Sequence, residues 1–60
     1  MQKVICIYTG RGLNVGNIYY IYLGSICSNS DGEWYANVYK DDKQDIFIGY
    51  YRLEHFKSMV

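Results

Sequence analysis

The sequence predicts an all-β domain, a small barrel of about five antiparallel strands. Half of its 60 residues are hydrophobic and 18% are aromatic, which is too apolar for a disordered chain. No stretch keeps a helical period over about ten residues, and proline is absent. Short runs of β-forming residues alternate instead with turn residues at close spacing. Closing such a sheet also protects edges that would otherwise be sticky.

The first two strands are expected at residues 3–8 and 18–23. The first is apolar on both faces, so its pattern does not determine which face points inward. Glycines at residues 10 and 12 end it, and residues 13–17 form a turn in which Gly16 suits a positive φ. Alternation in the second strand places Tyr19, Ile21 and Leu23 on one face and Ile18, Tyr20 and Tyr22 on the other.

The remaining strands follow at residues 33–40, 46–51 and 57–60. Residues 24–32 form a polar loop in which Asp31-Gly32 is a strong hairpin signal, and residues 41–45 form a charged turn. Gly49 is suited to a bulge or to a close approach of another segment. Leu53 and Phe56 have the spacing of one short 3₁₀ turn before the last strand. The expected core sets are Tyr19 with Ile21, Trp34 with Val38, and Ile46 with Ile48.

The tyrosines are the most informative feature for function. A domain of this size cannot bury eight tyrosines, one tryptophan and two phenylalanines together, so some rings must lie on the surface. These rings either stabilise an exposed sheet as cross-strand pairs or form an interface with another molecule. The predicted partner-binding residues are Tyr20, Tyr22, Tyr35 and Tyr39, with Arg52 and His55 contributing near the last turn.

Charge and hydropathy narrow the classes of partner. Six basic and six acidic residues are interspersed, so the chain lacks the basic face typical of nucleic-acid binders. No apolar run approaches the roughly 18 residues of a membrane-spanning helix, and the N-terminus lacks the apolar region of a signal peptide. We therefore expect a cytoplasmic protein in which Cys6 and Cys27 are free thiols, the alternative being a single bridge between them.

The sequence predicts no enzyme, no cofactor and no metal site. His55 is the only histidine, and Cys6 lies within a strand, where a free cysteine behaves as a small buried hydrophobe. Two cysteines 21 residues apart lack the close pairing of structural zinc sites. The aspartates at residues 41, 42 and 45 lack the closing glutamate and the glycine of a calcium loop. A charged, solvated hairpin tip explains them better.

Three short motifs, in order, resemble a known family. The first motif is Lys3 followed by Val4-Ile5-Cys6-Ile7. The second comprises Leu13, Gly16, Tyr19 and Ile21, and the third comprises Gly49-Tyr50-Tyr51 and Phe56. The order and spacing resemble small SH3-like barrel proteins encoded by phages and prophages of Gram-positive bacteria. This resemblance covers most of the chain except residues 24–32, and Asn14, Asn17, Tyr50 and His55 depart from the pattern. It implies an SH3-like barrel whose fourth strand leads through one 3₁₀ turn into the fifth.

The resemblance also suggests a kind of partner, because some small phage proteins act by binding host defence or replication proteins. The acidic residues with which signalling SH3 domains contact basic, proline-rich peptides are replaced here by Thr9 and Gly10. We therefore expect a protein-binding module for a host protein. Single-strand nucleic-acid binding through base stacking and a structural homodimer remain the two alternatives.

Overall fold

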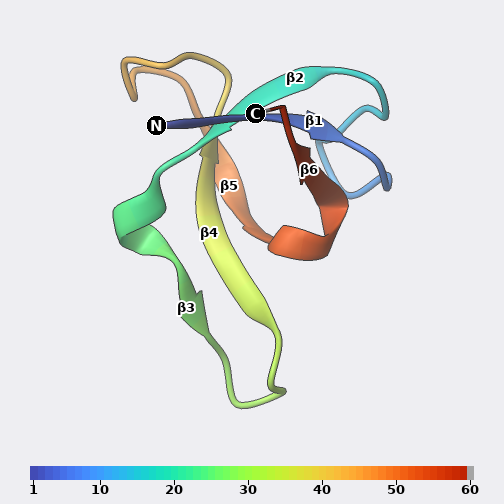
Figure 1. Ribbon diagram of the computed structural model, residues 1–60, viewed down its shortest axis with the longest axis vertical. Helices are drawn as coiled ribbons and strands as arrows, with labels where there is room; N and C mark the ends of the chain where they lie inside the picture. Colours follow the sequence, from blue (N-terminus) through green and yellow to red (C-terminus); the bar gives the residue numbers. More distant parts are fainter. Residues whose placement is uncertain (60) are drawn as a thin grey trace.

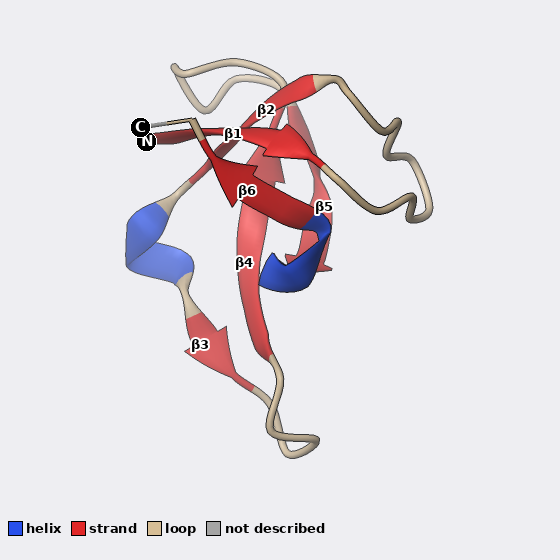
Figure 2. Ribbon diagram, turned by 45° about the vertical axis from the view of Figure 1, so that its right-hand side comes forward, coloured by secondary structure: helices blue, strands red, loops and turns tan. Residues whose placement is uncertain are grey.

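The computed structural model describes residues 1–59, which form six strands and two 3₁₀ turns in one antiparallel sheet (Figures 1 and 2). The elements are β1 (Gln2–Cys6), β2 (Ile18–Ile21), η1 (Leu23–Ser25), β3 (Cys27–Ser28), β4 (Trp34–Tyr39), β5 (Phe47–Arg52), η2 (Leu53–His55) and β6 (Phe56–Ser58). The all-β prediction, with a 3₁₀ turn before the last strand, is confirmed. The turn η1 and the two-residue strand β3 lie where only a polar loop was expected.

Strand β4 connects the two parts of the sheet. The strand order is β3-β4-β2-β1-β6, and β5 pairs with β4 as well. The second half of β4 pairs with β2, its first half pairs with β3, and β5 follows it along its length. The sheet curls around a small interior, and the β3–β4 hairpin projects from this body (Figure 1).

A change of direction after Ile21 explains the unexpected turn η1. The Ser25 hydroxyl donates a hydrogen bond to the Tyr22 carbonyl (2.6 Å) and accepts one from the Asn37 amide (2.8 Å). A side chain thus supplies the hydrogen bond that a continuing strand would have made to β4. Because the chain leaves the strand here, Leu23 lies exposed in η1, and its predicted place on the buried face is wrong.

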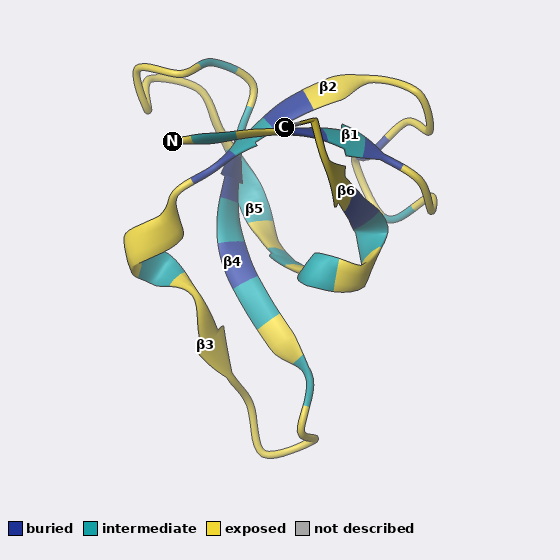
Figure 3. Ribbon diagram, viewed as in Figure 1, coloured by how far each residue is buried: buried dark blue, intermediate teal, exposed yellow. Residues whose placement is uncertain are grey.

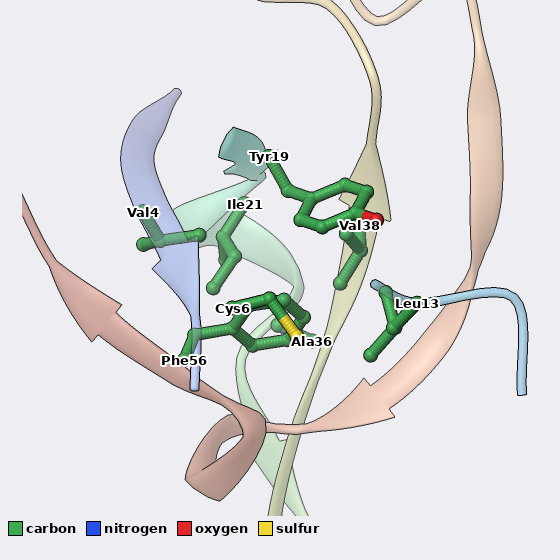
Figure 4. Packing of buried hydrophobic residues seen from close by; sticks show 8 residues of the cluster. All are labelled: Val4, Cys6, Leu13, Tyr19, Ile21, Ala36, Val38 and Phe56. Carbon is green, nitrogen blue, oxygen red and sulfur yellow. The ribbon is translucent and has the colours of Figure 1, made fainter. Parts of the chain in front are cut away.

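The core lies inside the curl of the sheet (Figures 3 and 4). Its most buried residues are Val4, Cys6, Leu13, Tyr19, Ile21, Ala36, Val38 and Phe56. Burial of Val4 and Cys6 shows which face of β1 points inward, a choice that the apolar pattern left open. The predicted core residues Tyr19, Ile21 and Val38 are confirmed, and the Tyr19 ring meets the Phe56 ring edge to face at 6.1 Å.

Two predicted core residues are instead on the surface. Trp34 is 56% exposed and Ile46 is 53% exposed. Trp34 lies on the same face of β4 as Ala36 and Val38. It stands at the start of the strand, however, where β4 extends past the body into the projecting hairpin. Ile46 precedes β5 and belongs to the turn, so only Ile48 of that predicted pair packs against the core.

The turns follow the local sequence signals. Gly32 has a φ of 81°, and its amide donates to the Asn29 carbonyl (2.9 Å), which confirms the Asp31-Gly32 hairpin between β3 and β4. The register of β4 and β5 shifts by one residue between the pairs of Gly49 and Phe47, so the predicted bulge is also confirmed. The last strand begins at Phe56 rather than Lys57, and residue 60 of the predicted strand lies outside the described residues.

The first and last strands are neighbours, so the two ends of the chain lie side by side (Figure 2). The Met59 amide donates to the Lys3 carbonyl (3.3 Å), and the Gln2 amide group donates to the Ser58 hydroxyl (3.1 Å). Their pairing joins the N-terminal strand to the strand that follows η2, which completes the barrel-like shape.

Candidate functional site: an aromatic face

One outer face of the sheet carries five aromatic rings, of which Phe47 and Tyr50 are exposed and the other three are half-buried. Strand register places its members on the side opposite to Ala36 and Val38. We call this surface the aromatic face, and it consists of Tyr20 of β2, Tyr35 and Tyr39 of β4, and Phe47, Tyr50 and Arg52 of β5.

The upper part of the aromatic face is a row across three strands. Tyr20 lies opposite Tyr39 in the β2–β4 pair, and Tyr39 lies opposite Phe47 in the β4–β5 pair. The rings of Tyr39 and Phe47 meet edge to face at 5.3 Å. Phe47 is 57% exposed, whereas Tyr20 and Tyr39 are half-buried. The row therefore presents one projecting ring beside two partly covered ones.

The lower part is a stacked pair held by a cation. The Tyr35 and Tyr50 rings stack at 5.1 Å with an interplanar angle of 11°. Arg52 donates a hydrogen bond from Nε to the Tyr35 hydroxyl (3.1 Å), and its guanidinium lies 5.9 Å from the centre of the same ring. Tyr50 is 44% exposed, and its hydroxyl shares a hydrogen bond of 2.7 Å with the Cys27 thiol of β3. Three strands thus fix the position of this cluster.

Charges at the lower end are arranged around Arg52. The guanidinium lies 3.6 Å from Asp31 Oδ2 and 3.5 Å from Glu54 Oε1. Hydrogen bonds from the Glu33 amide and then from the Tyr35 hydroxyl lower the pKa of Asp31, and Arg52 contributes in the same direction. The bond to Tyr35 raises the pKa of Arg52, and the bond shared with Cys27 raises the pKa of Tyr50. Arg52 therefore stays charged, and Tyr50 stays a neutral phenol, at physiological pH.

Four of the six predicted site residues come together in the aromatic face, and two do not. Tyr22 follows β2, and its ring leans over Gly24, whose added Cβ would lie 2.8 Å from that ring. His55 belongs to η2, where Nδ1 lies 3.2 Å from the Tyr8 carbonyl oxygen and the ring packs against Tyr51 and Phe56. Its contacts make His55 part of the packing around η2, a separate place in the fold.

Sequence reasoning missed Phe47, Tyr50 and Cys27 as neighbours of the predicted tyrosines. The bulge at Gly49 puts Phe47 and Tyr50 on the same face although they are three residues apart, which a strict period of two does not allow. The bulge signal at Gly49 was present in the sequence and would have predicted this change of face. Cys27 was assigned to a loop, so nothing in the pattern placed it beside β4.

Residues 1–59 contain no group of three or more histidine, cysteine or acidic side chains placed to hold a metal ion, and they enclose no pocket. Cys6 is buried and Cys27 exposed, and both are free thiols as predicted. Within the same residues, no helix has the length and apolarity needed to cross a membrane.

No protein-family model, curated protein or solved structure matches this chain. The geometry of the aromatic face is therefore the main observation from which a function can be argued.

Proposed function

We propose that this chain is a protein-binding module that docks on its partner through the aromatic face. The observation that carries the proposal is the exposure of Phe47 and Tyr50 on a surface whose other rings are already fixed by stacking and hydrogen bonds. Tyrosine and phenylalanine on rigid strands give a large contact area and lose little conformational entropy on binding. Arg52, stacked on the same surface, belongs to the residue types enriched at binding hot spots.

The resemblance to phage and prophage proteins supports a host protein as the partner. The proposed role is to inhibit or redirect that protein by covering part of its surface. Exposed rings set among half-buried ones on a single face of a sheet are the kind of surface that marks an interface in small proteins. Formal net charge is zero, which favours a partner surface recognised by shape and apolar contact over one recognised by charge.

Capture of a partner from a Gram-positive lysate tests this proposal. The tagged protein is compared with the double variant Phe47→Ser, Tyr50→Ser, with nuclease treatment of the lysate in parallel. The matched control is Tyr8→Ser, because Tyr8 is 62% exposed but lies after β1, outside the aromatic face. We expect the native protein and the Tyr8 variant to capture one host protein, whether or not the lysate is treated with nuclease. The double variant should not capture it.

Two results would count against the proposal. Equal capture by the folded double variant would show that another surface binds the partner. Capture that disappears with nuclease would favour the alternative, single-strand nucleic-acid binding.

One observation favours that second candidate function. The stacked Tyr35–Tyr50 pair with a guanidinium beside it is a surface on which a base can stack. A fluorescent oligonucleotide titrated at low and at moderate salt tests it, since phosphate contacts make binding fall steeply with salt. Binding that is absent even at low salt would remove this candidate.

A further inference from the structure

The free edge of β3 lies on the projecting hairpin. β3 is one of the terminal strands of the sheet; among the described residues it pairs with β4 alone, and no other element flanks it in Figures 1 and 2. A terminal strand presents unpaired backbone groups that can bind a further strand. The β3–β4 register determines the direction in which each of these backbone groups points.

The register shows which backbone groups are free. The Asn29 amide donates to the Glu33 carbonyl (3.0 Å), so residues 29 and 33 are a hydrogen-bonded pair. Hydrogen-bonded and non-hydrogen-bonded pairs alternate in an antiparallel ladder, so Cys27 and Tyr35 are hydrogen-bonded and Ser28 and Trp34 are not. The amide and carbonyl of Ser28 therefore point away from β4, along the outer edge of the sheet.

The edge carries neither charge nor proline, two of the features that usually prevent strands from pairing. Residues 22–30 contain no charged residue and no proline, and Leu23, Ile26 and Trp34 are exposed beside the edge. The nearest charges, Asp31 and Glu33, lie at the hairpin tip. An antiparallel copy would direct its own tip the opposite way, which keeps these like charges apart.

We propose that two copies of this chain pair through their β3 edges, antiparallel and centred on Ser28. In this register the two Ser28 residues exchange both of their backbone hydrogen bonds, and the Ser30 amide of each copy meets the Ile26 carbonyl of the other. A second copy suits this edge because the edge is neutral and its hydrogen-bonding pattern is self-complementary. Both copies use the same edge, so the pairing closes as a two-fold dimer. The two aromatic faces then lie on one continuous sheet.

Cys27 provides a reporter for the pairing. In the proposed register each Cys27 lies opposite residue 29 of the other copy, and the two thiols lie on the same face near the two-fold axis. A short bismaleimide therefore links two chains through Cys27, whereas Cys6 is buried and protected. Cys27→Ser shows whether the product depends on this thiol.

The experiment combines the linker with light scattering over a range of protein concentrations. We expect a concentration-dependent dimer and rapid linking in the native protein. Ser28→Pro removes a backbone amide that makes no hydrogen bond to β4. We expect this variant to remain monomeric at ten times the concentration at which half of the native protein is dimeric, or higher. Ser28→Ala is the matched control and should dimerise like the native protein.

A native protein that stays monomeric at millimolar concentration would overturn the proposal. So would a Ser28→Pro variant that keeps the native far-UV spectrum and still dimerises. Partner capture does not enter these readouts, so this proposal and the proposed function can fail separately.

Discussion

At the scale of single residues, side chains and glycines determine the turns around the sheet. Asp31 accepts from the Glu33 amide (2.9 Å) and from the Tyr35 hydroxyl (2.9 Å), so one carboxylate joins the hairpin tip to the aromatic face. Asp41 stabilises the turn at residues 41–45 in a similar way, because its carboxylate accepts hydrogen bonds from the backbone amides of Asp45 and Ile46. Hydrogen bonds of this kind favour the ionised carboxylate, and they lower the pKa of both Asp31 and Asp41.

The lowered pKa of Asp31 predicts a pH dependence of stability. Since folding depresses this pKa, the contribution is present above the unfolded value of about 3.9 and is lost as pH falls through the folded value. We expect Asp31→Asn to melt at a lower temperature than the native protein at pH 6, with the two melting temperatures converging as pH falls through the lowered folded pKa of Asp31. The control is Asp42→Asn, in the turn at residues 41–45, where the carboxylate is exposed and has no hydrogen-bond partner in the described residues. A gap that stays constant with pH would refute the assignment.

A second prediction at this scale concerns the contact between Tyr51 and the turn after β1. The Tyr51 hydroxyl donates to the Arg11 carbonyl, and a Cβ on Gly12 would lie 2.9 Å from that hydroxyl. Gly12 and Gly16 both have positive φ, but a Cβ on Gly16 would meet nothing within 4 Å. We expect Gly16→Ala to cost about 1 kcal/mol of unfolding free energy from backbone strain alone, and Gly12→Ala to cost more. Equal losses in urea titrations would show that the Tyr51 contact does not matter.

At the scale of elements, β4 shows how far the sequence pattern is informative. Its alternation was predicted correctly, with Trp34, Ala36 and Val38 on one face and Tyr35, Asn37 and Tyr39 on the other. Alternation gives the face of a residue, whereas burial also depends on whether other strands cover that part of the strand. Trp34 lies beyond the body and is exposed, although it was expected in the core. Ala36, on the same face of β4 but within the body, is fully buried.

A pair of substitutions on β4 tests this difference. Val38 is fully buried, and Val38→Ala should lower the unfolding free energy by about 2 kcal/mol, a large part of what a core of this size supplies. Trp34→Ala should lower it by less than about 1 kcal/mol, because the ring already faces solvent. Chemical denaturation of both variants checks the order. A greater loss for the tryptophan variant would mean that the projecting part of β4 packs against something in solution.

The same reasoning explains which parts of the site could be predicted. Tyr20, Tyr35 and Tyr39 were placed together because they lie on neighbouring strands in a regular register. Arg52 joined them because β5 leads directly into the predicted 3₁₀ turn. Phe47 and Tyr50 share this face because of the bulge that Gly49 signals. Cys27 reaches it through the turn η1, where the hydrogen bond from the Asn37 amide to the Ser25 hydroxyl is a tertiary contact that a local pattern does not contain.

At the scale of the whole molecule, long-range pairing of the two chain ends dominates the architecture. β1 pairs with β2 on one side and with β6 on the other, so the N-terminal strand lies inside the sheet and its neighbour on one side comes from the far end of the sequence. The turn at residues 41–45 is by contrast exposed and lies outside the strands. New chain ends should therefore be tolerated at that turn.

A circular permutant tests this arrangement. Joining the present ends with a linker of about four Gly and Ser residues, and opening the chain between Asp42 and Lys43, should give a folded protein with a melting temperature within about 10 °C of the native one. Opening between Ala36 and Asn37, inside β4, should prevent folding. Far-UV and near-UV circular dichroism distinguish the two. Failure of the first permutant would mean that the Asp41 turn is needed to set the β4–β5 register.

The adjacency of the two ends also affects when the protein can fold in the cell. Pairing of Val4, Ile5 and Cys6 with Ser58, Lys57 and Phe56 requires that these last residues have left the ribosome. Until then β1 lacks one neighbour, and the apolar residues on both of its faces are exposed to other molecules. The sheet of a nascent chain should therefore remain incomplete until residues 56–58 have emerged from the ribosome, when β6 can reach β1.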